Sequence, residues 1–329
     1  MKIALTGGGT GGHLAIAKAL GEAFKELGAT PIYIGSTSGQ DRQWFANEQI
    51  FHTRYFLPSS GVVNKKGVKK LKALGQIFLS TKEAASYLEG CEAVISVGGF
   101  SAAPASFAAL AKRIPLFIHE QNAHIGRLNR LLKPFAKDFY SSFFPPYYPY
   151  PVAPIYYQSR RIRQKLKTII FLGGSQGARQ INDLALQWAK GLSEAGIKII
   201  HQTGKQEYQR VKKEYERLGV EAQIFDFSFD LPSKIAKADI AIARSGASTL
   251  WELATNLLPA LYLPYPYAAN DHQRKNASFL AKKKASVLYN NHTLEDILNM
   301  DIASMSQNLQ NFSWPNGAQT IAQAILDHL

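Results

Sequence analysis

Two segments of this chain share one pattern, in which a short apolar run is followed by a glycine-rich turn and a helix-like segment. Residues 2–12 are KIALTGGGTGG, and residues 168–177 are TIIFLGGSQG. Each apolar run is long enough for one buried strand of a parallel sheet. The glycines let backbone N–H groups approach a ligand at the start of the following helix. We therefore predict an α/β protein that holds an anionic group at its glycine-rich turns.

The length of the chain, 329 residues, favours two α/β domains over one. Strand-like and helix-like segments alternate on both sides of residues 143–154, FFPPYYPYPVAP. Proline fixes φ and removes a backbone donor, so this stretch is typical of a semi-rigid linker. We predict Rossmann-like domains at 1–142 and 155–312, with a single long domain as the alternative. Residues 313–329 are predicted to form a helix that closes the second domain or packs back on the first.

Composition narrows the class of protein. The formal net charge is +14, which indicates contact with nucleic acid, an anionic membrane surface or phosphorylated ligands. The single cysteine, Cys91, excludes an intramolecular disulfide and precedes an apolar run, which favours a packed thiol over a nucleophile. No signal peptide is recognisable, and no apolar run approaches the ~20 residues that a membrane-spanning helix needs.

Gly7, Gly9 and Gly12 fit the dinucleotide-binding pattern GxGxxG, so a nicotinamide-dependent oxidoreductase is one alternative. That pattern also requires an acidic residue about 20 positions further on, at the end of the second strand, to bind the ribose. The second strand-like segment ends within residues 33–37, and no acidic residue follows it until Asp41. The missing acid disfavours a nicotinamide cofactor.

Polar residues follow several predicted strands in the first half. His13 comes directly after the first glycine turn, where a helix N-terminus disfavours the imidazolium and a neutral imidazole could act as a general base. Gly98 and Gly99 end another strand, and residues 119–122 (HEQN) follow the next. Because parallel α/β sheets bind ligands beyond the carboxyl ends of their strands, this pattern favours a functional site over ordinary loop solvation.

A similar arrangement occurs in the second half. Residues 244–252 (RSGASTLWE) combine a strand end, a turn of small residues and a helix start, whose amides suit a diphosphate. The carboxylate of Glu252 could accept both hydroxyls of a ribose, and a solvated helix acid is the alternative. Gln273 and Asn276 lie three positions apart, hence on one helical face, and could bind sugar hydroxyls.

In order along nearly the whole chain, these motifs resemble the MurG family of peptidoglycan glycosyltransferases, which add N-acetylglucosamine to lipid I. The matching segments are residues 8–13, 98–101, 119–122, 173–179, 245–252 and 272–277. The resemblance implies the GT-B fold, in which two Rossmann-like domains with parallel sheets face a central cleft. It also implies that UDP-N-acetylglucosamine binds mainly to the C-terminal domain and the lipid acceptor to the N-terminal domain.

The resemblance further implies roles for individual residues. His13 and Glu120 match the positions suspected of acid–base catalysis. The residues that match donor-binding positions are Thr10, Gly11, Gly12, Asn122, Ser175, Ser228, Ala247, Ser248, Thr249, Leu250, Trp251, Glu252, Gln273 and Asn276. One departure concerns a family arginine that contacts the nucleotide, because Ala153 stands at its position. Arg160, Arg161 or Arg163 could replace it, or the contact could be lost.

The expected reaction is an inverting displacement in which the muramyl 4-hydroxyl attacks the anomeric carbon and UDP leaves. Backbone amides of the glycine-rich turns would stabilise the charge on the leaving diphosphate. We expect no metal and no cofactor, because no carboxylate pair with metal-binding spacing stands out. Rival enzymes with the same fold are a UDP-N-acetylglucosamine 2-epimerase and a transferase with a soluble acceptor.

Residues 65–79 combine a basic run, KKGVKKLK, with apolar residues that suit a helix on an anionic membrane surface. A solvated helix face is the alternative. We expect a peripheral protein on the cytoplasmic face of the bacterial cell membrane. A nucleic-acid-binding module is a further alternative, but the aromatic residues form no evident stacking platform, so we expect no nucleic-acid partner.

Overall fold

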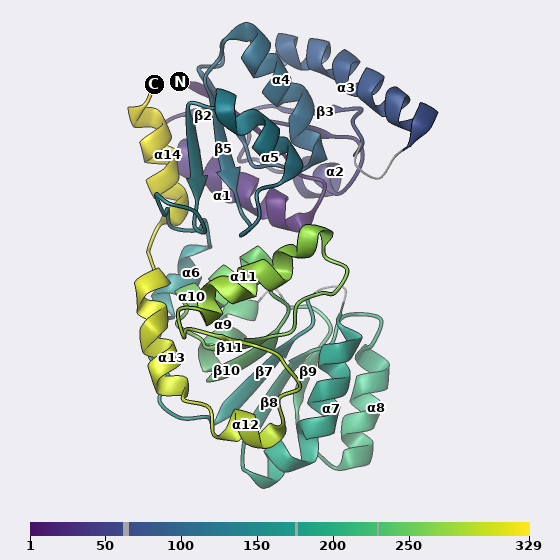
Figure 1. Ribbon diagram of the computed structural model, residues 1–329, viewed down its shortest axis with the longest axis vertical. Coiled ribbons are helices and arrows are strands. Elements are labelled where there is room, and N and C mark those ends of the chain that lie inside the picture. Colours follow the sequence, from purple (N-terminus) through teal and green to yellow (C-terminus); the bar gives the residue numbers. More distant parts are fainter. Residues whose placement is uncertain (62–65, 175–176, 229) are drawn as a thin grey trace. The chain divides into compact units, whose positions relative to one another are not determined.

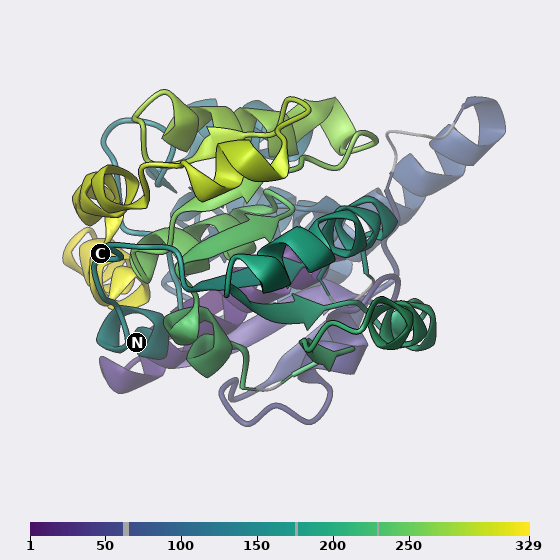
Figure 2. The same ribbon diagram turned by 90° about the horizontal axis from the view of Figure 1, so that it is seen from below.

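The chain forms two compact units (Figure 1). Unit 1 contains Met1–Val152 together with Asn316–Leu329, and unit 2 contains Ala153–Pro315. Each unit has its own six-stranded parallel sheet with helices packed against it (Figures 1 and 2). The computed structural model describes residues 1–61, 66–174, 177–228 and 230–329. The predicted fold class, two Rossmann-like α/β domains with parallel sheets, is confirmed.

The sheet of unit 1 has the strand order β3-β2-β1-β4-β5-β6. Its strands are β1 (Lys2–Thr6), β2 (Thr30–Ser36), β3 (Arg54–Leu57), β4 (Ala93–Ser96), β5 (Leu116–Glu120) and β6 (Asp138–Ser141). The central strand β1 is apolar because it is covered on both faces, and Ile3 pairs with Pro31 on one side and Ala93 on the other. The strand order reverses between β1 and β4, which is where sheets of this kind bind ligands.

Helices cover this sheet, and one of them comes from the far end of the chain. The helices of unit 1 are α1 (Gly11–Glu26), α2 (Asp41–Phe45), α3 (Gly67–Tyr87), α4 (Ala103–Lys112), α5 (Arg127–Leu132) and α14 (Gly317–Asp327). The helices α3 and α4 pack together, and buried residues of α3, α4 and α5 form one core with the sheet. The C-terminal helix α14 lies against α1, where Gln319 donates a 2.6 Å hydrogen bond to Glu26.

Most of the proline-rich stretch, predicted as a linker over 143–154, lies within unit 1. Phe143 and Tyr150 are buried, and the rings of Tyr140 and Tyr148 meet edge to face at 4.7 Å. The Tyr148 N–H also donates to the Ser141 carbonyl. Aromatic packing therefore attaches this stretch to the sheet, and unit 2 begins at Ala153.

Unit 2 repeats the topology of unit 1, with the strand order β9-β8-β7-β10-β11-β12. Its strands are β7 (Thr168–Leu172), β8 (Lys198–Gln202), β9 (Gln223–Phe225), β10 (Ile240–Ala243), β11 (Ala260–Tyr262) and β12 (Val287–Leu288). Its helices are α6 (Pro154–Gln158), α7 (Arg179–Glu194), α8 (Tyr208–Leu218), α9 (Leu231–Lys237), α10 (Ala247–Thr255), α11 (His272–Ala281), α12 (Leu294–Leu298) and α13 (Ile302–Leu309). The central strand β7 corresponds to β1, and β10 corresponds to β4.

Candidate functional site

The first glycine turn, after β1, is tied to its surroundings through its own backbone. Gly8 N–H donates to the Gly98 carbonyl at 3.2 Å, and Gly9 N–H donates to Asp41 Oδ2 at 2.7 Å. Gly7 and Gly9 have φ angles of +122° and +82°, which favour glycine. Because the N–H groups of Gly8 and Gly9 already have acceptors within the protein, only the amides at the start of α1 remain suited to an anion.

The turn after β4 packs directly on the first turn. A Cβ atom at Gly99 would clash with the Gly8 carbonyl oxygen, and one at Gly7 would lie 2.5 Å from the Gly98 carbonyl oxygen. Glycine is therefore required at these positions by backbone-to-backbone contact. The two turns meet at the carboxyl ends of β1 and β4, so the sequence-predicted glycine motifs of unit 1 form one surface.

His13 lies in the first turn of α1. Its Nδ1 is 2.8 Å from Thr10 Oγ1, and the ring is partly exposed. A Cβ atom at Gly98 would lie 3.5 Å from His13 Cδ2, so the imidazole packs over the turn after β4. Thr10, Gly11 and Gly12, which precede His13, are exposed or partly exposed. The predicted residues of the first motif are thus grouped at the switch point of the sheet.

Glu120 is buried, and both of its carboxylate oxygens accept hydrogen bonds. Oε1 accepts from Asn122 N–H at 3.0 Å, while Oε2 accepts from Gly126 N–H at 2.9 Å and from Asn129 Nδ2 at 3.0 Å. Burial raises the pKa of Glu120, and these hydrogen bonds act in the opposite direction. The carboxylate therefore closes the loop that carries the partly exposed Asn122.

His119 precedes Glu120 and points to the other face of the sheet, because side chains alternate along a strand. It is fully buried, with its ring 6.0 Å from that of Tyr150. Burial, and then the neighbouring charge of His13, lowers the pKa of His119 to about 3. The predicted HEQN run is therefore split between the interior and the loop.

In unit 2, the glycine turn after β7 is pinned against the backbone of the neighbouring strand. Gly173 N–H donates to the Gln202 carbonyl at 3.2 Å, and a Cβ atom at Gly177 would lie 2.6 Å from the Thr203 carbonyl oxygen. Ser175, a predicted donor contact, lies outside the described residues. Ser228 is partly exposed, and its Oγ accepts a 3.1 Å hydrogen bond from Asp230 N–H.

The helix α10 presents only some of its predicted side chains. Ser248, Thr249 and Glu252 are partly exposed, whereas the side chains of Leu250 and Trp251 are fully buried. The side chain of Ala247 is buried as well. A helix of 3.6 residues per turn cannot direct six consecutive side chains at one ligand, so the buried three could contact one only through their backbone.

Glu252 is the acidic residue of this helix, and its pKa is shifted. Burial raises its pKa from 4.5 to about 7, and a hydrogen bond from the Tyr156 side chain acts in the opposite direction. Tyr156 lies in the short helix α6, and nothing in the sequence indicated that it contacts Glu252. At neutral pH the carboxyl group is therefore shared between its charged and neutral forms.

Gln273 and Asn276 differ in accessibility although they share a helical face. Gln273 is partly exposed, and its Oε1 accepts a 2.9 Å hydrogen bond from Tyr265 N–H, which leaves its amide NH2 as a donor for a ligand. Asn276 is fully buried, and its Nδ2 donates to the Ser245 carbonyl at 3.1 Å. Asn276 thus holds the turn before α10 from inside the unit.

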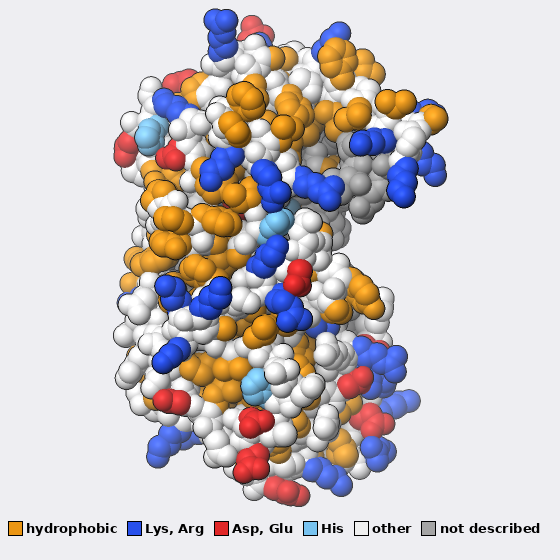
Figure 3. All heavy atoms as spheres, viewed as in Figure 1, with side chains coloured by type: hydrophobic (Ala, Val, Ile, Leu, Met, Phe, Trp, Pro, Cys, Tyr) orange, Lys and Arg blue, Asp and Glu red, His pale blue; other side chains and the backbone are white. Residues whose placement is uncertain are grey.

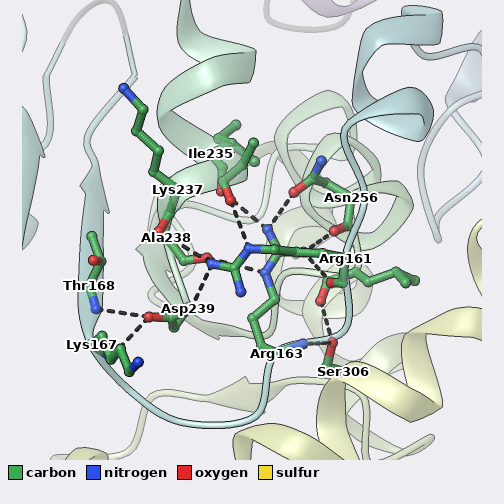
Figure 4. Close-up of polar contacts among 12 residues, drawn as sticks. Arg161, Arg163, Lys167, Thr168, Ile235, Lys237, Ala238, Asp239, Asn256 and Ser306 are labelled. Carbon is green, nitrogen blue, oxygen red and sulfur yellow. Dashed lines mark hydrogen bonds and ion pairs between the residues drawn. The ribbon is translucent and has the colours of Figure 1, made fainter.

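The arginines that could replace the missing family arginine have other contacts. Arg163 is fully buried and donates to the carbonyl oxygens of Ile235, Ala238 and Asn256, and to Asn256 Oδ1 at 2.6 Å (Figure 4). Burial lowers its pKa to about 9. Arg161 forms a 2.7 Å ion pair with Asp239 in the same cluster. Both are thus held by the protein itself.

Arg160, the third candidate, stacks its guanidinium over the ring of Tyr157 at 3.7 Å and donates to Ser313. The sequence did not indicate the Arg161–Arg163 cluster, because most of its acceptors lie more than 70 residues away along the chain and many of them are backbone carbonyls. Within the described ranges, no group of three or more His, Cys, Asp and Glu side chains has the arrangement of a metal site.

Two doubly wound sheets, each with glycine-rich turns at its switch point, define a two-domain α/β enzyme of the GT-B class. Residues 3–141 match the glycosyltransferase family 28 N-terminal domain, and residues 168–327 match the glycosyltransferase family 28 C-terminal domain. The chain belongs to glycosyltransferase family 28.

Relatives with similar sequences cover nearly the whole chain. A protein of a Nitratiruptor species is 57% identical over 99% of this chain and 98% of its own length. One from Campylobacter fetus subsp. fetus is 51% identical over 98% of this chain and 99% of its own length. Both are named UDP-N-acetylglucosamine--N-acetylmuramyl-(pentapeptide) pyrophosphoryl-undecaprenol N-acetylglucosamine transferase.

Solved structures also resemble this chain over nearly its whole length. The crystal structure of MurG from Acinetobacter baumannii superposes with a TM-score of 0.82 at 28% identity, covering 99% of each chain. UDP-GlcNAc 2-epimerase from Neisseria meningitidis has a TM-score of 0.64 at 14% identity, again over 99% of each chain, which shows a shared fold alone. The predicted resemblance to the MurG family is confirmed, and so is the prediction of a hexosyltransferase.

Proposed function

We propose that this enzyme transfers N-acetylglucosamine from UDP-N-acetylglucosamine to the muramyl 4-hydroxyl of lipid I, with inversion, in peptidoglycan synthesis. The observation that carries the proposal is identity of 57% and 51%, over both domains, to relatives named for this reaction. The 2-epimerase alternative is not favoured, because its solved representative shares only the fold.

The donor is proposed to bind at the carboxyl end of the unit 2 sheet. The start of α10 carries the partial positive charge of a helix N-terminus, which suits the diphosphate. Glu252 is proposed to accept the ribose hydroxyls, and the exposed amide of Gln273 to bind the sugar. Backbone groups of residues 247–251, together with Ser175 and Ser228, complete the proposed contacts from this unit.

His13 is proposed to be the general base. When its Nδ1–H donates to Thr10 Oγ1, Nε2 keeps a lone pair that can take the proton of the acceptor hydroxyl as the new bond forms. In this tautomer Thr10 orients the imidazole ring. The amides of Gly11 and Gly12 and the side chain of Asn122 are proposed to contact the donor from unit 1.

Glu120 was the second acid–base candidate. Its carboxylate already accepts two hydrogen bonds from the loop that it closes and one from Asn129 of α5, so taking a proton would disrupt that loop. We therefore assign Glu120 the positioning of Asn122 rather than the proton transfer.

The helix α3 is proposed to dock on an anionic membrane surface. Val68, Leu71, Phe78 and Leu79 are 60–70% exposed, and basic side chains lie among the apolar ones along this helix (Figure 3). Basic residues near an anionic leaflet contribute about 1 kcal/mol each, and the apolar residues would enter the interface. Lys65, the first residue of the predicted segment, lies outside the described residues.

No helix in the described part of the chain is long and apolar enough to cross a bilayer. The proposed place of action is the cytoplasmic face of the bacterial membrane, where the nucleotide sugar and the lipid headgroup meet. In this proposal, the +14 net charge attracts anionic lipids and the diphosphate of the donor. No nucleic-acid partner is proposed.

The test measures UDP release in three reactions. One contains lipid I, one contains a water-soluble muramyl sugar, and one contains no acceptor. We expect rapid release only with the polyprenyl-linked acceptor, together with formation of the disaccharide product. Equal turnover with a soluble sugar would indicate a different transferase, and conversion of the donor to its 2-epimer would indicate an epimerase.

A further inference from the structure

Asp41 is a fully buried carboxylate that binds the first glycine turn. Its Oδ2 accepts the Gly9 N–H at 2.7 Å, and its Oδ1 accepts the Ser36 N–H at 2.9 Å. The Tyr33 hydroxyl lies 3.1 Å from Oδ1 and also 2.9 Å from the Gly7 carbonyl oxygen. A carboxylate can be buried only where such donors satisfy it, and these donors include the backbone of the glycine turn.

The residues that surround the Asp41 carboxylate approach it so closely that two of these positions have no space for a side chain. A Cβ atom at Gly8 would lie 2.6 Å from Asp41 Oδ1, and one at Gly35 would lie 2.8 Å from the same atom. Gly39, with φ of +91°, approaches from the exposed side, where a Cβ atom would lie 2.9 Å from Gly9 Cα. The loop after β2 therefore holds Gly9 both through Asp41 and through close backbone contact.

Gly9 is the hinge on which the position of His13 depends. It directly precedes Thr10, the N-cap residue of α1, and Thr10 Oγ1 contacts His13 Nδ1. Because glycine has no Cβ atom, its backbone can adopt many conformations, including the positive φ seen at Gly9. The charge-assisted hydrogen bond from Gly9 to Asp41 selects one of them, since bonds to ionised groups are about twice as strong as neutral ones.

We propose that Asp41 is a positioning residue for glycosyl transfer, which fixes Gly9 so that the Thr10–His13 turn presents the imidazole to the acceptor hydroxyl. The inference rests on the proposed function, in which His13 is the base. Displacement of a reacting group by about 1 Å can lower the rate about 10²-fold. The carboxylate acts through the backbone and touches no substrate.

The first experiment replaces Asp41 by Asn, which has the same shape but cannot accept hydrogen bonds at both side-chain positions. With lipid I as acceptor, Asp41→Asn should lower kcat at least ~10-fold and change the KM for UDP-N-acetylglucosamine much less, because the proposed ribose and sugar contacts lie in unit 2 and only the Gly11 and Gly12 contacts lie in the displaced turn. The matched control is Ser36→Ala, which removes the hydroxyl at the end of β2 that donates to the Ser59 carbonyl at 2.8 Å and accepts from Ser38 N–H at 2.9 Å. Ser36→Ala leaves intact the hydrogen bond from the Ser36 N–H to Asp41 Oδ1. Its kcat should therefore stay within about twofold of the wild-type value.

A spectroscopic measurement separates positioning from general stability. In the full chain labelled with ¹⁵N-glycine, the Gly9 amide proton should resonate downfield because it donates to a carboxylate, and Asp41→Asn should move it upfield. Ser36→Ala should leave it in place. An unmoved Gly9 resonance in Asp41→Asn, or equal losses of kcat in the two variants, would overturn the inference.

Should Asp41→Asn fail to fold, Gly39→Ala tests the same hinge from the exposed side. Its Cβ would press on the Gly9 backbone while the Asp41 carboxylate stays in the chain, so a kcat that falls much more than the donor KM changes supports the inference, and wild-type kcat overturns it. A wild-type enzyme that transfers nothing to lipid I would instead refute the proposed function, and full activity in His13→Ala would refute the assignment of His13 as the base. An active, His13-dependent enzyme with wild-type kcat in Asp41→Asn refutes the role of Asp41 alone.

Discussion

The turns after β1 and β7 occupy equivalent places in two sheets of the same topology, yet they are held in different ways. In unit 1 a buried carboxylate, Asp41, binds the backbone of the turn. In unit 2 the turn lies against neutral backbone, with Gly173 N–H on the Gln202 carbonyl. The negative charge of Asp41 weakens anion binding at the start of α1, so the diphosphate is proposed to be held mainly by the helix N-termini of unit 2. In the proposed function, the same motif would therefore serve proton transfer in unit 1 and diphosphate binding in unit 2.

The strongest test of this division is His13→Ala. We expect kcat to fall at least ~10²-fold, because the proton of the acceptor hydroxyl would lose its acceptor, while the Kd for UDP-N-acetylglucosamine measured by calorimetry changes little. His52→Ala is the matched control, since His52 is an exposed histidine of the same unit. A His13 variant with nearly full turnover would move the base to another residue or to water, and unit 1 would lose its proposed role.

The membrane contact should also belong to unit 1 alone. Replacing Lys66, Lys69 and Lys70 by Gln should remove about 3 kcal/mol of attraction, or about 10²-fold in partitioning onto anionic phospholipid vesicles at low salt. The control replaces Lys282, Lys283 and Lys284, which are exposed in unit 2 and give the same change in net charge. Sedimentation with vesicles measures both. Equal losses in the two triple variants would indicate a general charge effect and remove the role of α3.

Donor affinity should depend on unit 2. Glu252→Ala should raise the KM for UDP-N-acetylglucosamine about 10- to 100-fold, since a charge-assisted hydrogen bond contributes about 1.5–3 kcal/mol. Glu295→Ala, an exposed acid of the same unit, should leave it unchanged. If the donor KM of Glu252→Ala equals that of the wild type, the ribose is bound elsewhere.

The last prediction concerns stability rather than activity or binding. Burial raises the pKa of Glu252 from 4.5 to about 7, so the native state binds an extra proton between these pH values. The stability that this group contributes is fully present below pH 4.5 and is lost as the pH rises through 7, by up to about 3 kcal/mol. Glu252→Gln should therefore be more stable than the wild type at about pH 8 and similar at about pH 4.5.

Urea unfolding of the two proteins across this range measures the difference directly. Comparing the variant with the wild type also cancels the pH-dependent contribution of the buried histidines to the free energy of unfolding. Burial lowers the pKa of His119 and of His201 to about 3, so both destabilise the wild type and the variant alike as the pH falls below 6.5. A pH-independent difference would show that Glu252 is not perturbed.

Much of the site could be predicted from sequence where function depends on local pattern. The glycine turns after β1, β4 and β7 follow apolar runs, so their place at strand ends could be predicted, as could the place of His13 directly after the first turn. Asn276 shows the limit. It shares a helical face with Gln273, but it is buried against the Ser245 carbonyl, which periodicity along α11 does not indicate.

The sequence by itself determined the fold class, the order of the strands along the chain and the family, because apolar period, glycine placement and motif order are local properties. Only the tertiary structure decided the partners of buried charges. Asp41 was the acid that came too late for a dinucleotide site, and folding brings it to Gly9, 32 residues away. Arg163 similarly finds its acceptors in α9, just after α9 and just after α10. Burying such groups requires donors or acceptors from distant segments, and packing alone chooses which segments supply them.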